Sequence, residues 1–194
     1  NLPCYDIRDT VEITIYDQHI ANAGTDIILC NELSTILSGN VVTGTAISSW
    51  YLNTFSPNVP VFNSSQANTT LSNLVSGGVY SLVWEITNGI CPVSRDTVNV
   101  FNQIEPQASF IQSADEICQD DSVMFVSTSS IQPPDVISSF SWIINGKTYS
   151  SVSHTENFPN AGNYDATLVI TSANGCADTL TKIDAVFVHT NPIA

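Results

Sequence analysis

The sequence predicts an all-β chain built from β-sandwich domains in tandem. Two observations support this prediction: a composition suited to strands, and a long internal repeat. Hydrophobic residues make up 43% of the chain and charged residues only 11%, and the apolar segments are rich in Val, Ile, Thr and Ser, which favour β-sheets. No segment combines a 3.6-residue apolar period with helix caps. We therefore expect strands throughout.

The repeat is visible in the sequence itself. Residues 4–13 (CYDIRDTVEI) recur as residues 91–100 (CPVSRDTVNV), and a shorter echo, CADTL, begins at Cys176. The cysteines of these segments are 87 (91 − 4) and 85 (176 − 91) residues apart. This period is longer than that of a solenoid repeat and matches a small sandwich domain.

The period predicts where the domains lie. We expect residues 1–17 to be the C-terminal strand of a truncated preceding repeat. Residues 18–103 and 104–190 are expected to form two complete Ig-like sandwiches, and residues 191–194 to begin the next linker. The linker mark Pro106-Gln-Ala recurs as Pro192-Ile-Ala, in step with the repeat.

Each complete repeat has the internal features of an Ig-like sandwich. Apolar and polar residues alternate over 81–86, 122–127 and 166–171, as in half-buried strands. Each repeat has room for about seven short strands, one central Trp and a Tyr near the start of a late strand. The pattern predicts Trp142 as a core residue packed on a disulfide, and Trp50 and Trp84 as core residues.

The five cysteines predict the compartment. Cys30 and Cys91 are 61 residues apart (91 − 30), and Cys118 and Cys176 are 58 apart (176 − 118). These matched separations favour one disulfide within each repeat, which leaves Cys4 unpaired. Disulfides persist outside a reducing cytosol, so we expect an extracellular, cell-surface location.

Metal sites have limited support in the sequence. No Cys-x-x-Cys pair is present, and no histidine stands at a zinc-ligand spacing. Clustered carboxylates at domain junctions can bind Ca²⁺ through oxygen ligands. The candidates for such a site are Asp17, Asp26, Asp115, Asp120 and Asp121. No other cofactor is expected.

The charge excludes several classes of partner. The net charge is −14, from 18 acidic and four basic residues, so nothing here can neutralise the phosphates of a nucleic acid. No apolar run approaches the roughly 20 residues that cross a bilayer. We expect a monomeric fragment without membrane insertion, whose partners are neighbouring repeats of the same chain and a surface polysaccharide.

The second repeat resembles a PKD domain, an Ig-like sandwich of bacterial surface and secreted proteins. The resemblance lies in Ala108-Ser-Phe, Phe140-Ser-Trp, Phe158-Pro-Asn-Ala-Gly-Asn-Tyr and Asn174-Gly-Cys-Ala-Asp-Thr. The sequence departs from the PKD pattern after Trp142, where Asn145-Gly146-Lys147 keeps a turn but lacks its acidic residue.

The first repeat resembles modules of large surface proteins of gliding Bacteroidota. The likeness lies in the segments 21–30 (ANAGTDIILC) and 78–91 (GVYSLVWEITNGIC). It implies a stalk or adhesive segment of a gliding-motility adhesin exported by type IX secretion. The alternative is an accessory module pair, or a glycan-binding module, of a secreted hydrolase.

Two surface features suggest a relation to sugars, one as a glycan-binding site and the other as sites of O-glycosylation. A glycan site would use Tyr51, Phe55 and Phe62 around a Pro-rich loop, because loops at sandwich ends carry binding function. The recurrent Asp-Thr/Ser-aliphatic tripeptides resemble sites of O-glycosylation, although they also suit strand residues with a surface Thr. They begin at Asp9, Asp96, Asp121 and Asp178.

Catalysis is not expected. The sequence has no Gly-x-Ser-x-Gly elbow, and no histidine stands in a motif that would activate a nucleophile. We therefore interpret the chain as a non-enzymatic segment.

Overall fold

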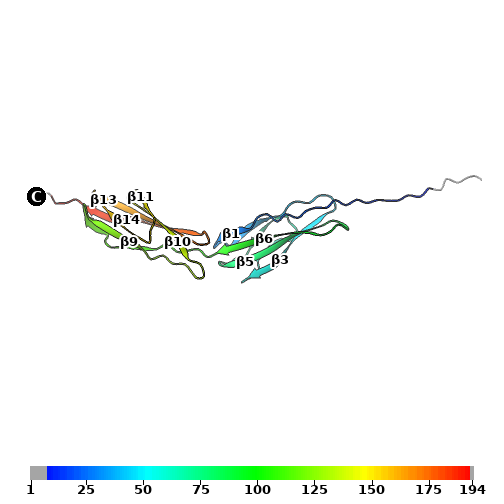
Figure 1. The fold of residues 1–194 in the computed structure, drawn as a ribbon, viewed down its shortest axis with the longest axis horizontal. Coiled ribbons are helices and arrows are strands. Elements are labelled where there is room, and N and C mark those ends of the chain that lie inside the picture. The colour runs from blue at the N-terminus through cyan, green and yellow to red at the C-terminus, as the bar shows by residue number, and fades with distance from the viewer. Residues whose placement is uncertain (1–7, 193–194) are drawn as a thin grey trace, which may run out of the picture.

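The computed structural model describes residues 8–192, which form fourteen β-strands and no helix. Two sandwiches lie end to end, the first with strands β1 to β6 and the second with β7 to β14 (Figure 1). The all-β prediction of tandem Ig-like sandwiches is confirmed, because strands alone build both bodies.

The first sandwich packs a four-stranded sheet, in the order β1-β6-β5-β3, against the pair β2-β4. β1 runs parallel to β6, so that Cys30 lies opposite Gln103. The other neighbours are antiparallel. The strands are β1 (Ile27–Cys30), β2 (Ser34–Ser38), β3 (Ile47–Ser56), β4 (Asn68–Ser72), β5 (Gly78–Thr87) and β6 (Ser94–Gln103).

The second sandwich packs a five-stranded sheet, β11-β10-β13-β14-β8, against the three strands β12-β9-β7. It repeats the parallel pairing of the first, because β8 runs parallel to β14 and Cys118 lies opposite His189. The strands are β7 (Phe110–Gln112), β8 (Glu116–Cys118), β9 (Ser122–Ser127), β10 (Ile137–Ile144), β11 (Lys147–Tyr149), β12 (Ser153–Asn157), β13 (Gly162–Ser172) and β14 (Ala177–His189).

Each sandwich has its own apolar core, and the tryptophans lie in these cores as predicted. Trp50 and Trp84 are buried in the first core with their rings 4.9 Å apart. Trp142 is buried in the second core against Phe110 and Phe125. The indole N–H of each tryptophan donates to a backbone carbonyl, as a buried indole requires. The expectation that Trp142 packs on a disulfide was wrong, because aromatic rings take that place.

Residues 8–17 form no strand in this structure, and the expectation that residues 1–17 are the C-terminal strand of a preceding repeat stays a prediction. A strand is held by the ladder of hydrogen bonds to a neighbour, and the described part of this segment lies beside none. It extends away from the first sandwich (Figure 1). Residues 1–7 lie outside the described part of the chain.

Candidate functional site: a disulfide-locked junction

A disulfide joins the two sandwiches. It links Cys30, the last residue of β1, to Cys176, in the turn between β13 and β14, with a Cα–Cα distance of 5.6 Å. Cys176 is fully buried and Cys30 is partly buried. The bond closes the place where the end of the first sandwich meets the beginning of the second.

The expected pairs Cys30–Cys91 and Cys118–Cys176 were therefore wrong. The two cysteines of one sandwich lie at opposite ends of it. Cys30 pairs in register with the last residue of β6, whereas Cys91 precedes the first. Ten residues of extended strand span roughly 30 Å, and a disulfide needs Cα atoms about 4.4–6.8 Å apart. The same holds across the 13 residues of β14 for Cys118 and Cys176.

Cys91 and Cys118 are free thiols in the structure. Cys91 is partly buried in the turn between β5 and β6, and Cys118 is exposed at the end of β8. The prediction that Cys4 is unpaired falls on a residue outside the described part of the chain.

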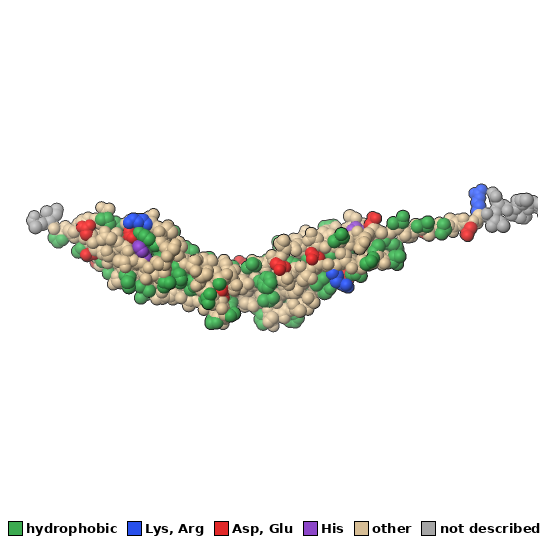
Figure 2. Space-filling view, in the orientation of Figure 1, with side chains coloured by type: hydrophobic (Ala, Val, Ile, Leu, Met, Phe, Trp, Pro, Cys, Tyr) green, Lys and Arg blue, Asp and Glu red, His purple; other side chains and the backbone are tan. Residues whose placement is uncertain are grey.

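Hydrogen bonds fix the connector beside the disulfide. The carboxylate of Asp178 accepts a 2.7 Å hydrogen bond from the backbone N–H of Ala108. Gln107 and Ser130 exchange two backbone hydrogen bonds of 2.8 and 3.0 Å. A shallow hollow next to them is lined from both sandwiches by Asn31, Ser76, Pro106 and Asp178, among others. The junction forms a bend in the outline of the molecule (Figure 2).

The same anchor occurs in the first sandwich. There Asp96 accepts a 2.7 Å hydrogen bond from the backbone N–H of Ala23. In both repeats the other carboxylate oxygen accepts from the N–H of the following Thr. The recurrent Asp-Thr thus has a structural role, since its Asp binds the segment that leads into each sandwich. Thr97 and Thr179 are exposed, and their glycosylation stays a prediction.

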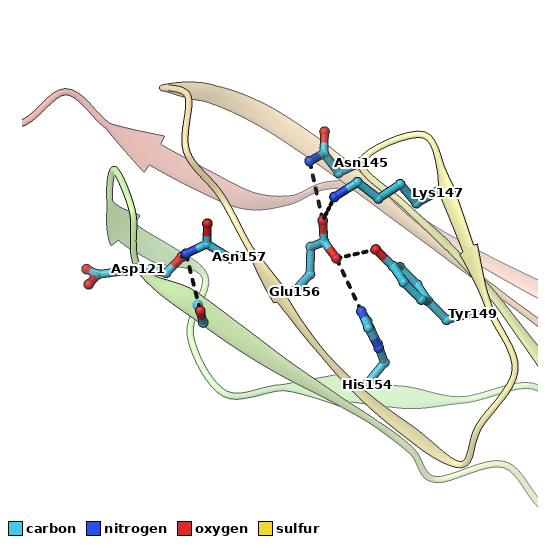
Figure 3. Close-up of polar contacts among 8 residues, drawn as sticks. Asp121, Asn145, Lys147, Tyr149, His154, Glu156 and Asn157 are labelled. Atoms are coloured by element: carbon cyan, nitrogen blue, oxygen red, sulfur yellow. Dashed lines mark hydrogen bonds and ion pairs between the residues drawn. The ribbon is translucent and has the colours of Figure 1, made fainter.

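A buried carboxylate links the two sheets of the second sandwich. Glu156, on β12, lies 4% exposed and faces the β10–β11 hairpin of the other sheet (Figure 3). Lys147 Nζ donates to it at 2.9 Å, and His154 Nε2 lies 3.2 Å from its second oxygen. Tyr149 and Asn145 also donate to it. The Tyr149 and His154 rings stack with centroids 3.4 Å apart.

These donors determine the charge of Glu156. Burial acts to raise its pKa, but the hydrogen bonds from Tyr149, Lys147, His154 and Asn145 outweigh burial and lower the pKa to about 2. Hydrogen bonding to Glu156 raises the pKa of both Lys147 and Tyr149. The carboxylate is therefore ionised with its oxygens occupied, as suits a structural lock. Sequence reasoning missed it, although Glu156 stands at an inward position of an alternating strand.

The calcium candidates are not gathered into one site. Asp26 accepts from Asn99, Asp115 from Gln112, and Asp121 from the backbone N–H of Cys118. Asp17 offers its backbone carbonyl to Asn88, and Asp120 adopts a positive φ of 71° in a turn. Within residues 8–192, no three His, Cys, Asp or Glu side chains form a group that could hold a metal ion.

The three aromatic candidates separate into two environments. Tyr51 and Phe55 lie on β3, at an edge of the first sheet, with 38% and 45% of their surface exposed. Phe62 packs against the core of the first sandwich. The structure therefore leaves Tyr51 and Phe55 available to a ligand and directs Phe62 inward.

A family model matches the second sandwich. Residues 103–188 match the PKD domain family, and no curated protein matches the chain. The chain is similar to the PKD1 domain of the Vibrio cholerae metalloprotease PrtV, with 32% identity over 41% of this chain and 93% of that one, at a TM-score of 0.36.

Two solved structures resemble a longer part of the chain. Fibronectin(III)-like modules of Clostridium thermocellum CbhA share 12% identity over 88% of this chain and 95% of theirs, at a TM-score of 0.50. Extracellular domains 3–5 of Drosophila OTK share 12% identity over 87% of this chain and 60% of theirs, at 0.58. At this identity the likeness shows the fold alone.

The matches indicate where domains of this type are found and whether they are usually catalytic. PKD and Ig-like domains with a disulfide are of the extracellular type and are typically non-catalytic. No helix suited to crossing a bilayer occurs in the described residues. On the family match and the sandwich that coincides with it, residues 103–188 of this chain belong to the PKD domain family.

Proposed function

We propose that this chain is a non-enzymatic segment of a large extracellular surface protein, in which sandwiches in series hold an extended shape. One observation carries the proposal: the Cys30–Cys176 disulfide joins the end of one sandwich to the start of the next. A covalent bond beside a short connector leaves the neighbours little freedom to reorient. An extended spacer needs this property.

The family resemblance adds a narrower proposal. The chain serves as the stalk or adhesive body of an adhesin of gliding or attached bacteria, exported by type IX secretion. Contact with a surface polysaccharide is a second candidate function, supported by the exposed rings of Tyr51 and Phe55 on one strand. Weak contacts of this kind gain strength when many repeats engage together.

Small-angle X-ray scattering tests the spacer. We expect the oxidised chain to scatter as an elongated pair of bodies with one well-defined longest dimension. A chain with Cys30→Ser and Cys176→Ser should sample a wider range of dimensions, while Cys118→Ser, which leaves the junction bond intact, should match the parent. A compact profile for the oxidised chain would contradict the proposal.

A pull-down on cellulose and chitin tests the polysaccharide contact. Retention should fall for Tyr51→Ala and Phe55→Ala. Ile47→Ala is the matched control, because Ile47 is an exposed apolar residue of the same strand without a ring. Equal retention of all three variants would refute a role for the aromatic pair.

A further inference from the structure

The two free cysteines occupy the same positions as the two bonded ones. Cys118 ends β8 beside β14 as Cys30 ends β1 beside β6. In each case the next residue donates its N–H to the carbonyl of the cysteine's partner in the ladder, at 3.1 Å from Gln119 to His189 and at 3.0 Å from Asn31 to Gln103. We call Cys30 and Cys118 the strand-end cysteines.

Cys91 corresponds in the same way to Cys176. Both lie in the hairpin turn that precedes the last strand of their sandwich, and both closely follow a glycine of positive φ, Gly89 at 56° and Gly175 at 91°. We call Cys91 and Cys176 the turn cysteines. Each sandwich thus has a turn cysteine at one end and a strand-end cysteine at the other.

The surroundings of Cys91 support this correspondence independently. Its Sγ lies 3.6 Å from the backbone carbonyl of Tyr16 and donates to it. Because residues 4–13 recur at 91–100, Tyr16 is the counterpart of Gln103, the residue that lies opposite Cys30. The free thiol of Cys91 therefore lies where a preceding repeat would place its strand-end cysteine.

We propose that Cys91 and Cys118 are sites of disulfide bonds to neighbouring repeats of the same chain. Cys118 bonds the turn cysteine of the following sandwich, and Cys91 bonds the strand-end cysteine of the preceding one. Every junction then carries the bond seen between Cys30 and Cys176. This inference rests on the proposed function, in which further sandwiches flank this pair.

The chemistry is a two-electron oxidation. Two thiols lose two protons and two electrons and form one S–S bond. A small-molecule disulfide such as glutathione disulfide accepts them through a mixed disulfide and leaves as two thiols. No other redox partner is needed.

A lengthened chain tests both cysteines together. Residues 24–103 are appended after Ala194. Ala23 and Ala108 are counterparts, because each donates its N–H to the Asp anchor of its own sandwich. Ala194 is the next counterpart, because Pro192-Ile-Ala repeats the linker Pro106-Gln-Ala, so the appended copy begins with the residue after Ala23. The original copy carries Cys91→Ser so that its peptide differs from the appended one. After refolding with glutathione disulfide, alkylation and non-reducing peptide mapping identify the bonds.

We expect Cys118 to be linked to the appended Cys91, with Cys30–Cys176 retained, and Cys4 and the appended Cys30 to be alkylated. The Cys30–Cys176 bond in the same molecule reports that folding and oxidation succeeded. A chain that carries Cys118→Ser as well should leave the appended Cys91 alkylated. A second lengthened chain, with residues 109–194 appended and Cys118→Ser in the appended copy, should link Cys118 to one Cys176 peptide while the other Cys176 stays bonded to Cys30.

The proposal is wrong if Cys118 is alkylated, or bonded to Cys4 or to a strand-end cysteine, in both lengthened chains while Cys30–Cys176 forms. Disulfide-linked dimers in place of internal bonds would also overturn it. The scattering test uses the unmodified chain, so failure of the spacer and failure of the further disulfides are distinguishable.

Discussion

The carboxylate of Asp178 accepts a 2.7 Å hydrogen bond from the backbone N–H of Ala108, which lies 70 residues earlier in the sequence. Asp96 holds Ala23 in the same way, across 73 residues. A segment leading into a sandwich has backbone groups with no strand beside them, and a carboxylate supplies an acceptor for one of them. The Asp-Thr repeated in the sequence is therefore a marker of the junction.

Removal of this acceptor should destabilise the second sandwich. We expect Asp178→Ala to lower the free energy of unfolding by about 1–3 kcal/mol, because the N–H of Ala108 loses a charged partner. Asp178→Asn, which keeps an oxygen, should lose less. Urea unfolding measures the effect, with Glu12→Ala in the exposed N-terminal segment as control. Equal free energies of unfolding for Asp178→Ala and the parent chain would show that the Asp178–Ala108 hydrogen bond does not stabilise the sandwich.

Glu156 should make the second sandwich sensitive to acid. Its folded pKa, about 2, lies below the ordinary value of 4.5, so its contribution is complete above pH 4.5 and declines as the pH falls towards 2. That contribution is of order 3 kcal/mol. Glu156→Gln should lose it at neutral pH and show a flatter profile between pH 5 and 2.

The control for this experiment is Glu85→Gln. Glu85 pairs with Arg95 at 2.7 Å on the surface, and a surface pair contributes at most about 1 kcal/mol. Urea unfolding of the three chains at several pH values makes the comparison. If the free energy of unfolding of Glu156→Gln fell with pH as steeply as that of the parent chain, Glu156 would not be the source of the acid sensitivity.

The four described cysteines should differ in reactivity. In the folded, unreduced chain we expect iodoacetamide to modify Cys118 rapidly, because it is exposed, and Cys91 more slowly, because it is partly buried beside Tyr16. Cys30 and Cys176 should react only after reduction. Timed alkylation with mass spectrometry checks this order. Protection of Cys118 in the unreduced monomer would contradict the pairing.

The two cores should respond separately to mutation. Trp142→Ala removes the largest side chain from the second core, with an expected loss of about 3–5 kcal/mol there. Trp50 and Trp84 belong to the other core, so hydrogen exchange should accelerate in β9, β10 and β13 while β5 and β6 keep their protection. Equal acceleration in both sandwiches would mean that they unfold as one unit.

The sequence predicted what is local and what repeats. Alternation at 122–127 and 166–171 corresponds to β9 and β13, and the tryptophans lie in the cores, because inward positions follow from the period of a strand. The Cys pairs were assigned wrongly, because the neighbours of a cysteine depend on which ends of the strands meet in space, and separation along the chain does not report this.

Glu156 shows a different limit of prediction from the sequence. Its strand was short and polar in sequence, and nothing local indicated that Lys147, Tyr149 and Asn145 would converge on it from the other sheet. The contacts of a buried charge are set by how the sheets pack. The repeated Asp-Thr was visible at once, but its role required the position of Ala108.

The Cys30–Cys176 bond also determines which part of the chain can be stretched. A pull between the two ends passes from Cys30 directly to Cys176 through the sulfur atoms. Residues 31–175 are closed within that loop and lie off the covalent path of the force. Only the segments outside the loop can be drawn out while the bond holds, even if a sandwich unfolds. Reduction would release the whole loop, so the redox state of one bond sets the extensibility of the pair.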